Sequence, residues 1–256
     1  MTLARKAVNT LREEGGRTFL YRVCRRVLGR APTRSIQIAT RHIFNCDRHS
    51  YPPHPYKIIR VNPQSITSYS SKHGKWESVG SIQGGTCDLE SLPFEEMVKY
   101  RAVYGRFVEG KSWEETGIYE YFSNKLEKRR SFDSCSNMTE VKERYSEIDR
   151  LYWDMKEDGY DTSHHSSPPE WWQYRPINYV AVHVRRQGDL IFAGSGCHRL
   201  SIARILELPE IPVWVRARHR RWQKIRDTIG NCTQVAKLNP SRKPFLRHPD
   251  VQDLPL

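Results

Sequence analysis

Apolar residues recur at helical spacing in three stretches near the middle of the chain. The first stretch follows Pro93, a residue that suits the first position of a helix, and it stops at Gly110. The second opens on Ser112–Glu115, whose serine and glutamate have the spacing of a capping box. The third takes Thr139 as its cap and stops at Gly159, because glycine commonly ends a helix. The pattern predicts three consecutive helices.

In the C-terminal half the pattern changes to the period of two that is typical of strands. An alternating stretch runs into Gln187-Gly188-Asp189, which predicts a hairpin turn and a returning strand. A Gly-Ser-Gly loop then precedes a helix, another strand and a helix rich in arginine. The predicted strands are residues 57–61, 178–185, 190–193 and 210–215, and the predicted helices are residues 198–206 and 218–228.

The stretches between these elements lack periodicity. Residues 31–56 contain four prolines and are expected to form a linker. Residues 68–87 and 160–176 are rich in small polar side chains and are expected to form loops. Residues 237–256 hold four more prolines, so the segment 231–256 is expected to be a loose tail.

Residues 1–30 have the pattern of a basic amphipathic arm. They form two predicted helical pieces broken at Gly15-Gly16, with eight Lys or Arg against two Glu. A basic amphipathic helix can lie on an anionic membrane surface, which would make the contact peripheral. It can equally dock on the rest of the protein or on a partner, and both alternatives stay open here.

Composition narrows the class of protein. The chain has 256 residues and a net charge of +13, which favours polyanionic partners such as nucleotides or nucleic acid. Its six cysteines are scattered without a CxxC pair, which favours reduced thiols in a cytoplasmic protein. No apolar run approaches the roughly 20 residues of a membrane-spanning helix. Cys46, His49 and His54 fall short of the four ligands that zinc requires, so no metal site is predicted.

The segment GSGCHR, residues 194–199, joins a predicted strand to the start of a predicted helix. Unpaired N–H groups and the helix dipole favour an anion at such a position. Gly196 would let the backbone approach it, and Ser195 adds a hydroxyl. His198 and Arg199 add hydrogen-bond donors suited to phosphate oxygens. These four residues are therefore predicted to bind the phosphate of a nucleotide.

Cys197 supports a different chemistry at the same loop. A thiol at a helix N-terminus beside basic residues has a lowered pKa and becomes a better nucleophile. The alternative is a small residue that fills a tight strand-to-helix turn. Spacing alone does not decide between a catalytic cysteine and a structural one.

The segment from Gly194 to Val215 resembles the signature of the ParB/sulfiredoxin superfamily. GCHR in particular is similar to the sulfiredoxin active-site segment, whose cysteine attacks an oxidised peroxiredoxin cysteine beside bound ATP. In the ParB branch the same loop holds the phosphates of CTP, and some members are kinases or are described as nucleases. The positions that match the family pattern are Gly196, His198, Arg199, Ala203, Ile211, Pro212 and Val213.

The resemblance implies an α+β protein with a small mixed sheet and a glycine-loop helix. It places a ParB/sulfiredoxin-like domain at residues 57–230, with a helical insertion at about 88–160 and the basic N-terminal helix outside it. It also implies that a nucleoside triphosphate, CTP or ATP with Mg²⁺, binds at the loop for phosphate transfer or hydrolysis. Whether the protein is an enzyme stays open at this point.

Two other functions remain as alternatives. One is a redox enzyme based on Cys197. The other is a non-enzymatic nucleic-acid-binding or interaction protein, because the arginine-rich helix interleaves basic residues with Trp222. The side chains that would contact nucleic acid are Arg218, Arg220, Arg221 and Lys224.

Overall fold

The computed structural model describes residues 34–70, 79–161 and 179–255. The predicted N-terminal arm lies outside the described residues, as does most of the predicted loop at 160–176. Within the described part of the chain, no helix combines the length and the apolar character needed to cross a membrane.

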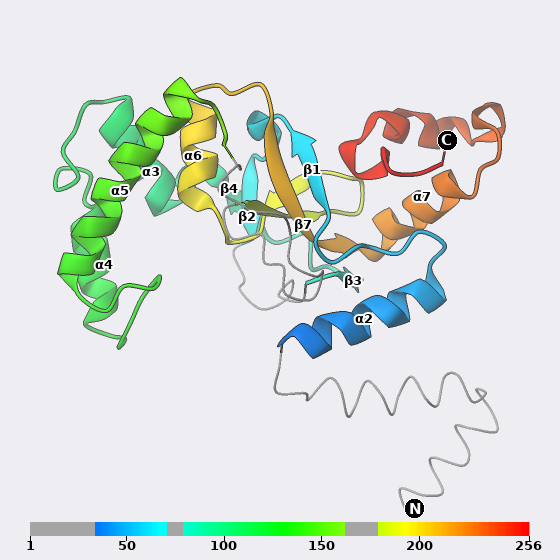
Figure 1. The fold of residues 1–256 in the computed structure, drawn as a ribbon, viewed down its shortest axis with the longest axis horizontal. Coiled ribbons are helices and arrows are strands. Elements are labelled where there is room, and N and C mark those ends of the chain that lie inside the picture. The colour runs from blue at the N-terminus through cyan, green and yellow to red at the C-terminus, as the bar shows by residue number, and fades with distance from the viewer. Residues whose placement is uncertain (1–33, 71–78, 162–178, 256) are drawn as a thin grey trace, which may run out of the picture.

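A mixed seven-stranded sheet forms the centre of the structure (Figure 1). Its order is β1-β7-β5-β6-β2-β4, and β3 pairs with the end of β7 beyond β1. This arrangement confirms an α+β class with a mixed sheet. The strands are β1 (Ile58–Val61), β2 (Ser68–Ser70), β3 (Ser81–Gln83), β4 (Ser91–Pro93), β5 (Val180–Val184), β6 (Leu190–Phe192) and β7 (Ile211–His219).

The central strands are buried on both faces, which explains their nearly continuous apolar sequence. Val182 of β5 and Val215 of β7 join the main core, whereas Ala181 and Trp214 face a second, smaller cluster. The predicted hairpin is confirmed, since β5 and β6 pair antiparallel from Val182 to Val184. Gly188 takes a positive φ of 98° at the turn.

Helices cover both faces of this sheet. One face carries α6, and α3 and α5 pack in turn on α6 (Figure 1). The three helices predicted between Pro93 and Gly159 are therefore present as α3, α4 and α5. The helices are α2 (Arg34–Arg48), α3 (Val98–Phe107), α4 (Ile118–Leu126), α5 (Met138–Glu157), α6 (Cys197–Ile205) and α7 (Arg220–Gly230).

The prediction of a linker at residues 31–56 is wrong for Arg34–Arg48, which forms helix α2. Prolines bracket this helix without interrupting it. Its inner face buries Ile38 in the second cluster, and Arg41 and Asn45 donate hydrogen bonds to the carbonyls of Val79 and Gly80. The helix therefore depends on contacts that are distant in sequence.

The prediction of a loose tail at residues 231–256 is also wrong for the described part of this segment. Three short 3-10 helices form there, η3 (Val235–Lys237), η4 (Pro240–Arg247) and η5 (Pro249–Val251). Pro240 and Pro249 begin η4 and η5, and Pro244 lies inside η4 without ending it. Asp250 and Val251 are fully buried, so this segment is part of the core.

Several element boundaries differ from the sequence prediction. Ser91–Pro93 pairs with β2 as a strand, so α3 begins at Val98 and not after Pro93. Residues 68–87 include β2 and β3 and are not simply a loop. The capping box forms as predicted, with Ser112 N–H donating to Glu115 Oε2 at 2.7 Å, although the regular helix starts later at Ile118.

Candidate phosphate-binding site

The loop between β6 and α6 is held against the start of β5. Gly194 and Gly196 both have positive φ angles, 85° and 81°. The Ser195 carbonyl accepts a hydrogen bond from the Ala181 N–H at 2.9 Å. A Cβ atom on residue 196 would lie 2.8 Å from the Val180 Cα, whereas one on residue 194 would meet nothing within 4 Å. Gly196 is thus required by packing as well as by conformation.

The N-terminus of α6 is left without a side-chain cap. Gly196 occupies the N-cap position in the left-handed conformation, and no side chain hydrogen-bonds there. The first bond within the helix runs from the Leu200 N–H to the Gly196 carbonyl at 2.9 Å. The N–H groups before Leu200, at the start of the helix, have no acceptor within the helix. They form the positive end of the helix dipole. Such an end is suited to an anion.

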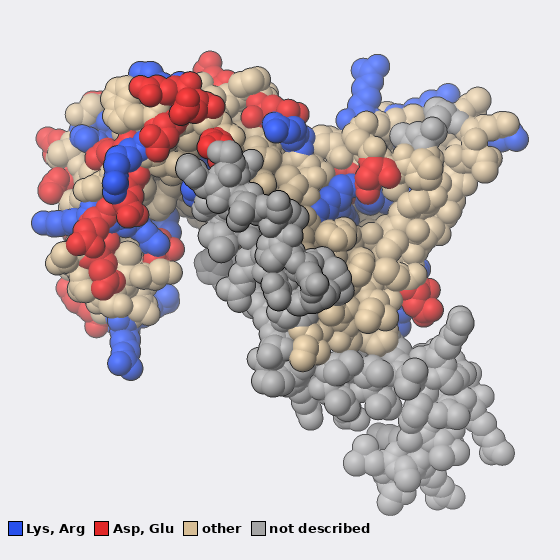
Figure 2. Space-filling model, in the orientation of Figure 1, with Lys and Arg blue, Asp and Glu red and all other residues tan. Residues whose placement is uncertain are grey.

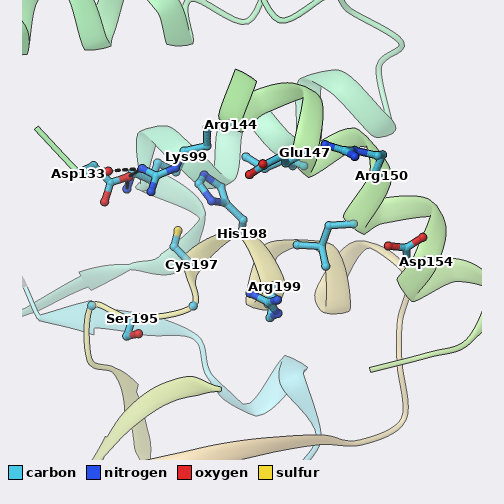
Figure 3. A pocket seen from close by; sticks show the side chains of 14 residues that line it. Lys99, Asp133, Arg144, Glu147, Arg150, Asp154, Ser195, Cys197, His198 and Arg199 are labelled. Atoms are coloured by element: carbon cyan, nitrogen blue, oxygen red, sulfur yellow. Dashed lines mark hydrogen bonds and ion pairs between the residues drawn. The ribbon is translucent and has the colours of Figure 1, made fainter. Parts of the chain in front are cut away.

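This helix end lines a cleft of about 640 Å³ between α6 and α5 (Figure 3). One wall is the GSGCHR loop, and the opposite wall comes from the predicted helical insertion. All five loop residues that were predicted to carry chemistry line this one cleft. The lining residues are Lys99, Asp133, Arg144, Glu147, Ile148, Arg150, Leu151, Asp154 and residues 194–199.

Two cations of the opposite wall are positioned by a single carboxylate. Asp133 Oδ2 lies 2.5 Å from Lys99 Nζ and 2.8 Å from Arg144 Nη1. Arg144 also donates to the backbone carbonyl of Asp133. Because one acid is shared by two bases, this group keeps a net positive charge near the loop, where Figure 3 shows it beside His198.

The His198 side chain extends from the loop toward the opposite wall, and it is a neutral imidazole (Figure 3). Burial, followed by the charge of Lys99, lowers its pKa to about 3, with Arg144 and Arg199 acting in the same direction. Its ring packs edge-on against Tyr145, with 5.6 Å between centroids. Its Nε2 atom is buried and has no hydrogen-bond partner among the described residues. A buried polar atom without a partner requires an explanation, and a ligand or water bound beside it would provide one.

The prediction of a low pKa for Cys197 is wrong. Burial raises the pKa of this thiol to about 12, which outweighs the helix N-terminus and the charge of Lys99. The sulfur lies 3.1 Å from Met97 Sδ and packs against the main core. At neutral pH the residue is therefore a thiol and not the thiolate that nucleophilic attack requires.

Four charged side chains of the cleft are free to meet a ligand. Arg199, Glu147, Arg150 and Asp154 form no hydrogen bond or ion pair with the described residues. Glu147, Arg150 and Asp154 lie on α5, for which the sequence prediction used only the apolar stripe, so the charged residues beside that stripe were missed. Arg144, Glu147, Leu151 and Asp154 follow helical spacing, so they share a face beside that stripe. This spacing is the feature of the sequence from which a polar face on α5 could have been predicted.

The alternative nucleic-acid site is only partly retained. Arg218 ends in β7, is fully buried and binds Asp250 through two hydrogen bonds of 2.8 and 2.6 Å, so it cannot reach a partner. Arg220, Arg221 and Lys224 are exposed on α7. From Arg216 to its end the chain holds ten Lys or Arg and three Asp. Figure 2 shows acids and bases mixed over the α3–α5 side and fewer acids on the α7 side.

A second group has the residue types of a metal site. Potential ligand atoms of Cys87, Asp88 and His219 lie within 4.8 Å of one another. However, Arg186 occupies both Asp88 oxygens, at 2.7 and 2.5 Å. His219 Nδ1 accepts the Arg221 N–H at 3.1 Å, so a neutral ring carries its proton on Nε2, the atom that faces this group. These contacts explain the cluster without a metal.

Comparison with known proteins adds no identification, since no family model, no curated protein and no solved structure matches this chain.

Proposed function

We propose that the cleft binds the phosphates of a nucleoside triphosphate, as the resemblance to the ParB/sulfiredoxin superfamily implies. Ser195, Gly196, His198 and Arg199 hold the phosphate, and CTP or ATP with Mg²⁺ is the ligand. Transfer or hydrolysis of the terminal phosphate is the class of reaction that this binding would serve.

One observation carries the proposal. A glycine loop, an uncapped helix end and a group of cations from a separate part of the chain line the same cleft. The backbone N–H groups and the helix dipole favour an anion at this position, and Arg199, Lys99 and Arg144 add positive charge. The redox alternative has no comparable support, because the pKa of the partly buried Cys197 thiol is raised to about 12.

Titration calorimetry with CTP and ATP in Mg²⁺ at near-physiological salt tests this proposal. Replacing Arg199 by Ala should weaken binding roughly 10- to 100-fold, the range for a lost charge-assisted hydrogen bond. The folded structure should persist, because Arg199 is partly exposed and forms no ion pair with the described residues. An unchanged affinity would contradict the assignment.

The exposed cations of α7 supply a control for attraction of the nucleotide by basic surface outside the cleft. A triple variant, Arg220→Gln, Arg221→Gln and Lys224→Gln, removes three positive charges from a surface outside the cleft, whereas Arg199→Ala removes one. Nucleotide affinity should stay within about twofold in this variant, since exposed charges are screened by salt. If the triple variant loses binding and Arg199→Ala does not, the ligand is held by the basic surface.

A further inference from the structure

Glu147 is out of place in a cleft that binds phosphate. It lies on α5 one turn beyond Arg144, and it lines the cleft opposite the loop. Figure 3 shows its carboxylate on the side that faces His198. A phosphate bound at the GSGCHR loop would lie near this negative charge, and like charges at close range oppose binding.

Among the residues that the structure describes, the Glu147 carboxylate has no ionic partner. Glu147 forms no hydrogen bond with these described residues either. Asp133, the other acid at this end of the cleft, differs because Lys99 and Arg144 both bind it. The Glu147 carboxylate is exposed to solvent on α5, and it is therefore open to a cation that arrives with the ligand.

We propose that Glu147 binds a divalent cation that enters the cleft on the phosphates of the nucleotide. This inference rests on the proposed function and names a metal-binding residue for it. Mg²⁺ in proteins is commonly held by one or two carboxylates together with substrate phosphates, and it keeps several waters. A single carboxylate opposite a phosphate cradle meets that requirement.

The position along α5 singles out Glu147 over the next acid of the same face. Asp154 lies seven residues further along, about 10 Å away at the rise of an α-helix. In Figure 3 it lies at the far end of the cleft from the loop. An ion on the phosphates can reach Glu147 and not Asp154, which is left for the part of the ligand beyond the phosphates.

The test compares the affinity for ATP in EDTA with the affinity for Mg·ATP, by calorimetry, in wild-type protein and in Glu147→Gln. Wild-type protein should bind Mg·ATP about tenfold more tightly, a typical size for such coupling. The Gln variant should lose this preference. It should also bind metal-free ATP at least as tightly as wild-type protein does, because the repulsion is gone.

Glu143→Gln is the matched control, one turn earlier on α5, exposed and outside the cleft. It should keep the wild-type ratio of the two affinities, and so should Asp154→Asn. An unchanged ratio in Glu147→Gln would overturn the inference, because the ion would then act only by neutralising ATP in solution. A lost ratio in Asp154→Asn alone would overturn it as well. If wild-type protein bound neither form, the proposed function itself would fail.

Discussion

Two clusters of charge, one beside α5 and α6 and one beside α7, lie at opposite ends of the molecule in Figure 1 and differ in how completely their charges are paired. Around the C-terminal segment, fully buried Asp250 accepts hydrogen bonds from Arg218 and from Trp222 Nε1, the latter at 2.8 Å. Asp253 binds Lys57 and Arg226 beside it. In the cleft, by contrast, Glu147, Arg150, Asp154 and Arg199 lack such partners among the described residues.

The difference separates a structural role from a binding role. Burying a charge is costly unless a partner and hydrogen bonds compensate for it, and the C-terminal cluster supplies both. The cleft charges stay partly solvated, so they can remain unpaired at little cost. A cluster whose charges are paired with one another stabilises the fold, whereas a cluster with unpaired charges can bind a ligand. Substitutions in the two clusters should therefore have opposite signatures, with stability lost in one and binding lost in the other.

The largest stability effect is expected at Asp250. Asp250→Asn leaves Arg218 buried without its countercharge, and breaking a buried pair on one side costs roughly 3–5 kcal/mol. Urea-induced unfolding should show this loss. Asp253→Asn should cost about 1 kcal/mol or less, because the Asp253 side chain is 48% exposed. Similar losses in both variants would remove the distinction between a closed buried pair and a solvated one.

The sequence predicts the helices and most strands because their signals are local. The spacing of Val141, Tyr145 and Ile148, and the alternation before Gly188, depend only on neighbouring residues. The loop was also found from its sequence, since glycines before a helix start are a local signal. These predictions needed no knowledge of the tertiary structure.

What the sequence does not predict depends on residues that meet only in the folded chain. Asp250 and Arg218 are 32 residues apart, and their pairing turns an expected loose tail into part of the core. Lys99 and Arg144 reach the cleft because α3 and α5 pack on α6. Burial of Cys197 depends on Met97, a hundred residues earlier, and it reverses the direction of the expected pKa shift.

A smaller effect should separate the two glycines of the loop. Gly194→Ala strains only the backbone, which costs roughly 1–2 kcal/mol in the left-handed region. Gly196→Ala adds a contact of 2.8 Å with the Val180 Cα, so an overpacking cost of about 1–3 kcal/mol comes on top. Thermal unfolding of the two variants measures the difference. Equal losses would show that β5 yields at Val180, and the cleft wall would then be less rigid than its packing indicates.

The effect that is smallest at neutral pH is a pH dependence of stability that traces to His198. Its pKa in the folded protein is lowered to about 3, against roughly 6.5 in an unfolded chain. The unfolded chain therefore binds the extra proton first as the pH falls. The stabilisation is complete above about pH 6.5 and is lost progressively toward pH 3, by at most about 1.4 kcal/mol per pH unit for this one proton.

His198→Gln should reduce this slope without removing it. His183 is fully shielded within β5, and burial lowers its pKa to about 3 as well, so its share of the slope should remain in the variant. Denaturation at a series of pH values from 7 to 4 gives both slopes. A bound phosphate would oppose the cations around His198 and raise its pKa, so saturating nucleotide should flatten the wild-type slope toward that of the variant. If nucleotide left the slope unchanged, the ligand would bind away from His198. The binding role that separates the cleft from the C-terminal cluster would then be contradicted.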